Sequence, residues 1–278
     1  MYKTNPLLIK KCRSLRRKGF TLTEILEATE LSKSTVYDHI YDIPLSDKIK
    51  RRIREERVKK FSKKRKGKCI LGRIVTKPKN WTKELIFLIS HFMFDGEITR
   101  HSCIYCNRSK TLINQVKFSM KKVFNLEPKN WTDKKTGVHR VSYHYVELAT
   151  YAREKAKELT KNILTDPLTY KKIFLQAFFD DEGCAYWCKR ARKVRGFQHN
   201  LKVLKLVQKL LKDFEIESKI DKKYQEIIIS RKENIIKFRN KINFSKGIYI
   251  NPNRKNSIWK KKLEKREILN KIIDSYQK

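Results

Sequence analysis

Acidic residues are scarce in this chain, where 29 Asp and Glu stand against 68 Lys and Arg in 278 residues. The resulting formal net charge of +39 is too large for a solvated surface alone. A compact chain with this excess repels itself unless a polyanion neutralises it. Composition therefore indicates a nucleic acid as the first candidate partner and an anionic membrane as the second.

Long apolar runs are also lacking. The longest run, around residues 85–94, is interrupted by Ser90 and His91 and is too short to span a bilayer. Near the start of the chain, Lys10 and Arg13 are among the basic residues that break any apolar signal core. We therefore expect no membrane partner and a cytoplasmic location.

Cysteine is sparse, with six residues in the whole chain. Without a secretion signal, disulfides are not expected. Cys103 and Cys106 have CxxC spacing, and Cys184 and Cys188 have CxxxC spacing, so a four-thiolate zinc site is conceivable. Each pair falls in an expected strand without the turn glycines of a zinc knuckle. We favour small buried hydrophobic residues over a zinc site.

Glycine is also rare, and two of the eight glycines end the most informative pattern in the chain. The segments LISHFMFDG (88–96) and LQAFFDDEG (175–183) each join an apolar stretch to an acid and a glycine. We expect two buried helices, each ended by its glycine, where a positive φ has no steric cost. The acids before the glycines are Asp95 and Glu182. Two such helices packed side by side would bring two carboxylates to one point, which suits divalent metal ions.

These two segments resemble the signature of the LAGLIDADG homing endonuclease family, Leu-x-x-x-hydrophobic-x-x-acid-Gly, seen twice in one chain. The resemblance covers about residues 81–278. It implies an α+β fold of two pseudo-symmetric αββαββα halves, 81–164 and 165–278, whose antiparallel sheets face DNA. The chain departs from the family where small residues are usual, at Ile89, Gln176 and Asp181. For close helix packing it offers Ser90, Ala177 and the two glycines.

The segments outside the motifs repeat in the same order in both halves. In the first half we expect strands over 97–101, 102–107, around 131 and over 138–144, and helices near 109–125 and 145–159. Asp166 and Pro167 are a typical helix start before the second motif. Asn107 recurs as Asn200 at an offset of 93, against 87 for the acids, which predicts a longer first hairpin in the second half. A basic helix over about 257–276 is expected to close the chain.

Residues 5–42 predict three short helices, in a small all-α domain that we place at residues 1–47. Gly19 ends the first helix, Thr21 and Glu24 form a capping box for the second, and Ser32 caps the third. Glu30 stands at the turn, where a left-handed conformation would cost about 1 kcal/mol.

The segment LSKSTVYDHI (31–40) resembles the helix-turn-helix of resolvases and transposases. The resemblance implies that the third helix enters the major groove. The candidate DNA-contacting residues are Lys33, Ser34, Thr35, Tyr37 and His39. The alternative is a three-helix domain that binds no DNA.

Residues 48–80 follow as a basic linker or arm, and its first part, 48–68, contains 13 Lys or Arg and only two acids. We expect this segment, including Arg51 and Arg52, to contact phosphates as a helix or arm. Such contacts add affinity for DNA without sequence specificity.

In the LAGLIDADG family, acids at the motif positions bind the metals and each half cuts one DNA strand. The resemblance therefore implies a double-strand DNA endonuclease in which Asp95 and Glu182 are the catalytic acids and the ligands of Mg²⁺ or Mn²⁺. Asp180 and Asp181 are alternative ligands. Supporting roles near the metals, in charge stabilisation or in ordering water, are expected for Gln198, Lys189, Arg231, Lys232 and Arg140. Polar residues on the strands, among them Arg100 and Arg195, are expected to read the major groove.

The two halves differ in sequence, so the expected partner is a long asymmetric site in double-stranded DNA. We expect a monomer without an obligate protein partner. Two alternatives stay open: a non-catalytic transcription regulator that joins the same fold to a helix-turn-helix, and an RNA-splicing maturase.

Overall fold

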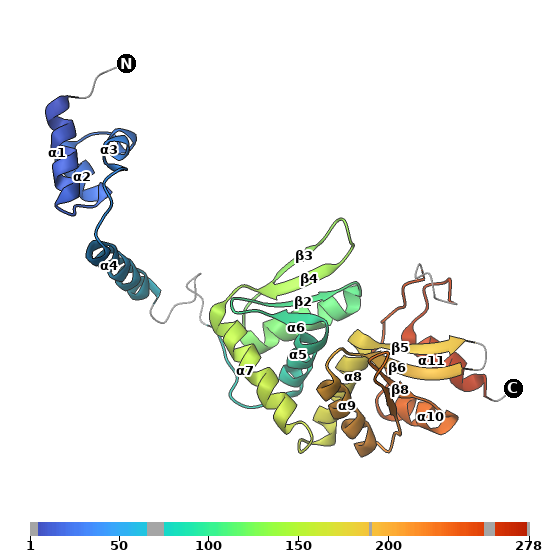
Figure 1. Cartoon of the computed structure of the whole chain (residues 1–278). Helices are drawn as coiled ribbons and strands as arrows, with labels where there is room; N and C mark the ends of the chain where they lie inside the picture. The colour runs from blue at the N-terminus through green and yellow to red at the C-terminus, as the bar shows by residue number, and fades with distance from the viewer. Residues whose placement is uncertain (1–4, 66–74, 189–190, 253–258, 277–278) are drawn as a thin grey trace. The chain divides into compact units, whose positions relative to one another are not determined.

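The computed structural model describes residues 5–65, 75–188, 191–252 and 259–276. The chain divides into two compact units, Met1–Gly72 and Arg73–Lys278 (Figure 1). Within the described residues, no helix is both long and apolar enough to cross a membrane.

The first unit begins with three helices, α1 (Pro6–Arg17), α2 (Leu22–Thr29) and α3 (Lys33–Ile40). Their small core consists of the buried side chains of Cys12, Ile25, Val36 and Ile40.

The sequence signals at the ends of these helices are confirmed. Thr21 and Glu24 form the reciprocal capping box, and the Ser32 side chain accepts a hydrogen bond from the backbone N–H of Thr35. Glu30 ends α2 in the left-handed conformation, with a φ of 57°. An L-residue with a Cβ is strained in this region, so Glu30 destabilises the unit relative to glycine.

The basic segment forms the helix α4 (Asp47–Arg65). It begins close to the three-helix core, because a Cβ on Gly19 would lie 2.2 Å from the Ile49 side chain. Arg52 also approaches Glu24, at 3.7 Å. The first half of this segment therefore has fixed contacts within its own unit.

The second unit contains two four-stranded antiparallel sheets with the same strand order. One sheet has the order β1-β2-β4-β3 and the other β5-β6-β8-β7. The strands are β1 (Gly96–Ile98), β2 (Cys103–Asn107), β3 (Lys129–Thr132), β4 (His139–Tyr143), β5 (Gly183–Cys188), β6 (Ala191–Phe197), β7 (Lys219–Asp221) and β8 (Glu226–Ile229). The matching order confirms the α+β fold with two pseudo-symmetric αββαββα halves.

Helices pack on the sheets and on one another to enclose one continuous core in this unit. They are α5 (Lys83–Phe94), α6 (Lys110–Phe124), α7 (Val146–Asn162), α8 (Leu168–Glu182), α9 (Leu201–Asp213), α10 (Lys232–Lys241) and α11 (Lys265–Asp274). The β5–β6 hairpin is longer than the β1–β2 hairpin, as the change of offset predicted.

Three local expectations are wrong. Pro167, in an extended conformation, is itself the N-cap of α8 and no side chain caps the helix, so Asp166 lies one residue too early. Arg100 lies in the turn after β1, because Thr99 closes that turn through hydrogen bonds with Ser102. The last helix begins only at Lys265 and buries an apolar face, so α11 belongs to the core.

Candidate functional site at the paired helix ends

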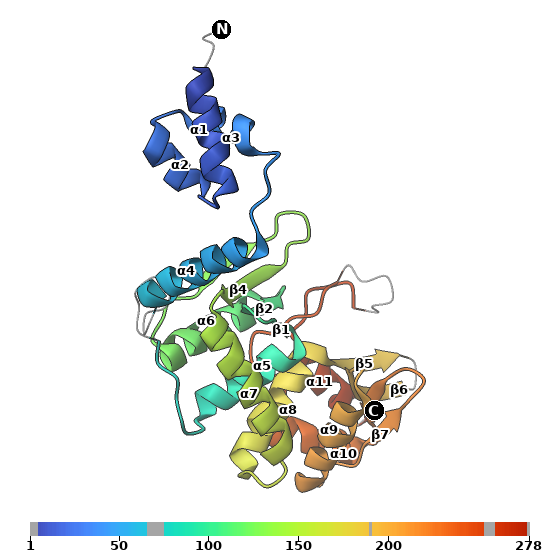
Figure 2. The same ribbon diagram turned by 60° about the vertical axis from the view of Figure 1, so that its left-hand side comes forward.

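Helices α5 and α8 pack side by side between the two sheets (Figures 1 and 2). Ser90 and Ala177 are buried in this region, with exposed fractions of 0% and 1%. The Ser90 hydroxyl donates to the backbone carbonyl of Ile86 at 2.7 Å, which removes its need for a partner on the other helix. These small side chains reduce the bulk between the helices, and the two C-terminal ends lie on the same side of the core.

The two motif glycines are needed for a reason other than the expected one. Neither Gly96 nor Gly183 has a positive φ. A Cβ on Gly96 would lie 2.5 Å from the Cα of Phe92, and one on Gly183 would lie 2.4 Å from the carbonyl oxygen of Phe179. Each strand thus leaves directly over the last turn of its helix, where only glycine fits. This close approach fixes the position of the acid that precedes it.

Both motif acids face one cavity of about 1560 Å³. Asp95 is the C-cap of α5, and Glu182 is the last residue of α8. The cavity wall also includes residues from both sheets and from the segment before α11, among them Cys106, Asn107, Tyr186, Arg195, Glu226, Tyr249 and Lys265.

The two carboxylates are buried enough, and close enough to other acids, to be hard to ionise. Burial, followed by the negative charges of Asp181 and Glu182, raises the pKa of Asp95 to about 7. Burial and the charge of Asp181 raise the pKa of Glu182 to about 7. Both groups are therefore partly protonated at neutral pH, and a cation between them would favour their charged forms.

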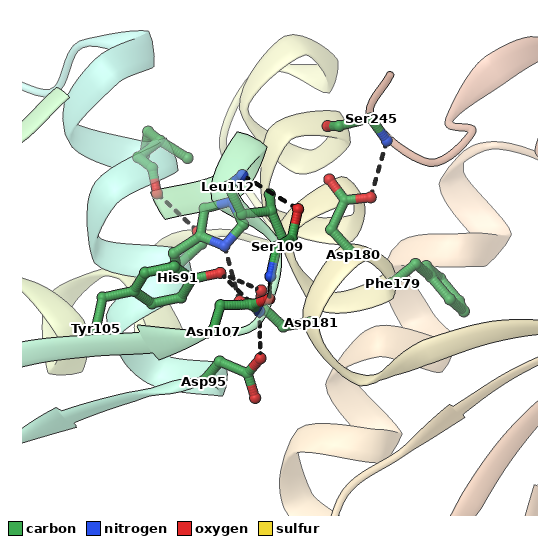
Figure 3. Close-up of polar contacts among 12 residues, drawn as sticks. His91, Asp95, Tyr105, Asn107, Ser109, Leu112, Phe179, Asp180, Asp181 and Ser245 are labelled. Atoms are coloured by element: carbon green, nitrogen blue, oxygen red, sulfur yellow. Dashed lines mark hydrogen bonds and ion pairs between the residues drawn. The ribbon is translucent and has the colours of Figure 1, made fainter. Parts of the chain in front are cut away.

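Asp95 is held by the first sheet (Figure 3). Asn107, at the end of β2, donates from Nδ2 to Asp95 Oδ2 at 2.7 Å. The same Nδ2 donates to the Tyr105 hydroxyl at 3.2 Å, and Asn107 Oδ1 accepts from the Ser109 N–H at 2.8 Å. Every polar atom of the Asn107 side chain is engaged, so its orientation is fixed.

Asp181 reaches from α8 into the first half of the unit. It accepts a hydrogen bond from the Tyr105 hydroxyl at 2.6 Å and pairs with His91 Nδ1 at 2.7 Å. Burial alone would lower the pKa of His91, but the Asp181 carboxylate outweighs it and the pKa is raised. The sequence interpretation treated His91 only as an interruption of an apolar run. That interruption was the signal that could have identified this cluster.

Lys265, the first residue of α11, is a buried cation at the end of α8. Its ammonium donates to the carbonyl oxygens of Asp180 at 2.7 Å and Phe179 at 3.3 Å. Burial lowers the pKa of Lys265, while the nearby acids act in the opposite direction. Asp180 is buried and accepts from the Ser245 N–H at 2.8 Å, and burial raises its pKa to about 6. No local sequence signal distinguishes Lys265 from the other lysines of this basic segment.

None of the expected supporting residues in the described part of the chain lines the cavity, but one of the residues expected to read the major groove does. Arg195 lines it, pairs with Glu226 at 3.2 Å and lies over the Tyr186 ring at 4.2 Å. Gln198 and Arg140 are absent from its wall; Arg140 lies on β4 beside Cys106.

Two further residues expected to support the site do not line the cavity. Arg231 is exposed and pairs with Glu217 at 3.2 Å, and Lys232 begins α10. Lys189 lies outside the described residues.

The candidate DNA-contacting residues of the first unit lie on α3 and α4. Lys33, Ser34 and Tyr37 are exposed, whereas Thr35 and His39 are half-buried. Arg51 and Arg52 are exposed on α4.

A divalent cation fits the donor set at the helix ends. The part of the chain that the structure describes contains no group of three or more His, Cys, Asp or Glu arranged to hold a metal. Mg²⁺, however, is usually held by one or two carboxylates, with phosphate and water as the remaining ligands. Asp95 and Glu182 offer two hard oxygen donors on an open cavity, and a cation there would favour the charged forms of two carboxyls whose pKa values burial and neighbouring acids raise.

Comparison with known protein families gives a match in the second half of the chain. Residues 169–243 match the LAGLIDADG-like domain family. The second half of the chain therefore contains a LAGLIDADG-like domain, and this match includes the second motif, 175–183. No curated protein matches the chain.

Several solved structures are similar to the chain. I-DmoI in complex with DNA and Mn has 16% identity and a TM-score of 0.45, over 58% of this chain and 96% of that one. The N-terminal LAGLIDADG domain of DUF199/WhiA has 17% identity and a TM-score of 0.44, over 61% and 87%. Full-length DUF199/WhiA from Thermatoga maritima has 15% identity and a TM-score of 0.47, over 72% and 63%.

Proposed function

We propose that this protein is a metal-dependent endonuclease that hydrolyses phosphodiester bonds in both strands of DNA. The observation that carries the proposal is the placement of Asp95 and Glu182 at one cavity, on the adjacent ends of two pseudo-symmetric helices. Their raised pKa values support it, because burial and neighbouring acids make both carboxylates hard to ionise, and a bound cation would stabilise their charged forms.

The chain's own residues would act as follows. Asp95 and Glu182 would hold Mg²⁺ or Mn²⁺ through carboxylate oxygens. The bound metal supplies an activated water and stabilises charge on the leaving oxygen. Asn107 orients Asp95, and Lys265 places a positive charge beside the acids. Arg195 presents a guanidinium on the cavity wall, where a phosphate can bind.

The partner would be double-stranded DNA with a long asymmetric site, bound by a monomer. The charge of +39 supplies non-specific affinity for phosphates. The halves differ at corresponding positions, so they would read different sequences. In the first unit, the exposed residues of α3 would contact bases as a helix-turn-helix, and Arg51 and Arg52 would contact phosphates.

A second candidate function is a DNA-binding regulator without nuclease activity. The observation that favours it is the separate three-helix unit, which offers DNA contacts that do not involve the acids. In a regulator, the negative charge of Asp95 and Glu182 would have no role and would repel the DNA backbone.

Single substitutions separate these two functions. Asp95→Asn and Glu182→Gln keep the side-chain size and remove the charge. The endonuclease proposal expects each variant to lose double-strand cleavage while its affinity for DNA in Ca²⁺ or EDTA stays close to that of the wild type. Loss of binding together with cleavage would indicate that the acids are structural.

A further inference from the structure

The Asp181 cluster breaks the pseudo-symmetry of the two halves. At the offset of 87 that relates the motif acids, Asp181 corresponds to Phe94, and Phe178 corresponds to His91. Phe94 packs edge-on against the Phe178 ring, with centroids 5.2 Å apart. At the corresponding place across the helix pair, Asp181 binds His91 instead.

The sheets differ at the same point. Tyr105 stands opposite Gly96 in the first sheet, and Gly196 stands opposite Gly183 in the second. A Cβ on Gly196 would lie 2.4 Å from the Phe178 ring, so the aromatic packing leaves no room for a side chain there. One half therefore contains an apolar contact where the other contains the hydrogen-bonded group of Asp181, His91 and Tyr105.

Stability does not explain the polar arrangement. The side chains of His91 and Asp181 are both fully buried, and His91 Nε2 has no hydrogen-bond partner among the described residues. A buried ion pair is often no more stable than well-packed apolar groups of similar volume. The same fold uses apolar groups at the related position, so the benefit of the polar group lies elsewhere.

The polar group leads directly to Asp95 (Figure 3). Because the Tyr105 hydroxyl gives its proton to Asp181, its oxygen accepts from Asn107. Asn107 in turn holds Asp95 Oδ2. Glu182, the corresponding acid, accepts no side-chain hydrogen bond from any residue in the described part of the chain.

We propose that Asp181 is a positioning residue that orients Asp95 through Tyr105 and Asn107, so that one metal ligand is preorganised and the other is not. The two halves of the site are then unequal, and the two DNA strands are cut at different rates. The consequence for cleavage rests on the proposed endonuclease function, whereas the consequence for metal binding does not.

The test uses Tyr105→Phe in the full-length chain, with Tyr143→Phe as the matched control. Tyr143 is also a buried tyrosine of the first sheet, but its hydroxyl donates to the Leu126 carbonyl and does not contact the acids. Calorimetric titration with Mn²⁺ should show affinity about tenfold weaker in Tyr105→Phe, as is typical when hydrogen bonds that orient a metal ligand are lost. Tyr143→Phe should titrate like the wild type. An unchanged titration for Tyr105→Phe would overturn the inference, as would a wild type that binds no Mn²⁺.

Two neutral variants of Asp181 provide a second test that does not depend on the folding of Tyr105→Phe. Asp181→Ala and Asp181→Asn both remove the charge, but only asparagine leaves an acceptor for the Tyr105 hydroxyl. Asp181→Asn should recover part of the Mn²⁺ affinity that Asp181→Ala loses. Equal affinities of the two variants would show that the charge alone matters and would contradict positioning.

Strand-specific cleavage gives the third readout, with a supercoiled plasmid that carries the gene's own locus from which the gene has been removed. Tyr105→Phe should slow the cutting of one strand by about tenfold and so accumulate nicked plasmid. A loss of the same size on both strands would indicate a merely structural defect and overturn the inference. If Tyr105→Phe weakens Mn²⁺ binding but the wild type cuts no DNA, the endonuclease proposal fails while the positioning role stands.

Discussion

Replacing Asp95 by asparagine should stabilise the metal-free protein, and the gain should grow with pH. The folded-state pKa of Asp95 is about 7, against an ordinary value of 3.8. In that interval the folded protein binds a proton that the unfolded chain has released, so the free energy of unfolding falls as pH rises from about 4 to about 7. At about 1.4 kcal/mol per pH unit, ionisation of Asp95 lowers the free energy of unfolding by about 4 kcal/mol at pH 8 and by about 1.5 kcal/mol at pH 5, relative to its value below pH 4.

Urea denaturation of the wild type and Asp95→Asn in EDTA measures this difference at pH 5 and pH 8. Glu154→Gln is the control, because Glu154 is exposed on α7 and forms no ion pair among the described residues. At pH 8, saturating Mg²⁺ should make the wild type more stable than Asp95→Asn, since the ion stabilises only a site with both carboxylates. An Asp95→Asn variant that is less stable than the wild type at both pH values would refute the reasoning.

Further predictions concern the motif glycines, the strained residue Glu30 and the first unit. Gly96→Ala and Gly183→Ala should each cost about 1–3 kcal/mol in denaturation experiments and weaken Mn²⁺ binding, because the new Cβ meets the helix backbone. Gly137→Ala, where φ is +68° and no atom lies within 4 Å of the added Cβ, should cost only about 1 kcal/mol and leave Mn²⁺ binding intact. Glu30→Gly should raise the midpoint of thermal unfolding of the first unit, by relieving about 1 kcal/mol of left-handed strain. Deleting residues 1–72 should narrow the footprint on DNA. It should also make the slope of log K against log salt less steep, by about 0.9 for each phosphate contact that is lost. An unchanged footprint would contradict a DNA-binding role for this unit.

The two-half fold could be predicted from the sequence because its signals are local and occur twice. The apolar helices, the acids and the following glycines lie within nine residues of each other, and the change of offset between Asn107 and Asn200 predicted the longer hairpin. The caps of the first unit were predictable for the same reason, since Thr21 and Ser32 each act on a backbone N–H three residues away.

The contacts across the helix pair could not be predicted in this way. Asp181 reaches residues 90 and 76 positions away in sequence, and Lys265 reaches Asp180 from 85 positions away. Such contacts depend on how α5, α8 and α11 pack, and no periodicity of a single segment contains that information. The role of the motif glycines was misinterpreted for a related reason: the close approach of each strand to its own helix is visible only in three dimensions.

Cleavage of DNA by the wild type, compared with the Asp95→Asn, Glu182→Gln double variant, tests the central claim most directly. The substrate is the gene's own locus with the gene removed, incubated in Mg²⁺ and then in Mn²⁺. We expect staggered double-strand cutting by the wild type alone, with similar DNA binding by both proteins. Tight, metal-independent binding by the wild type without any cutting would contradict the endonuclease and favour the regulator.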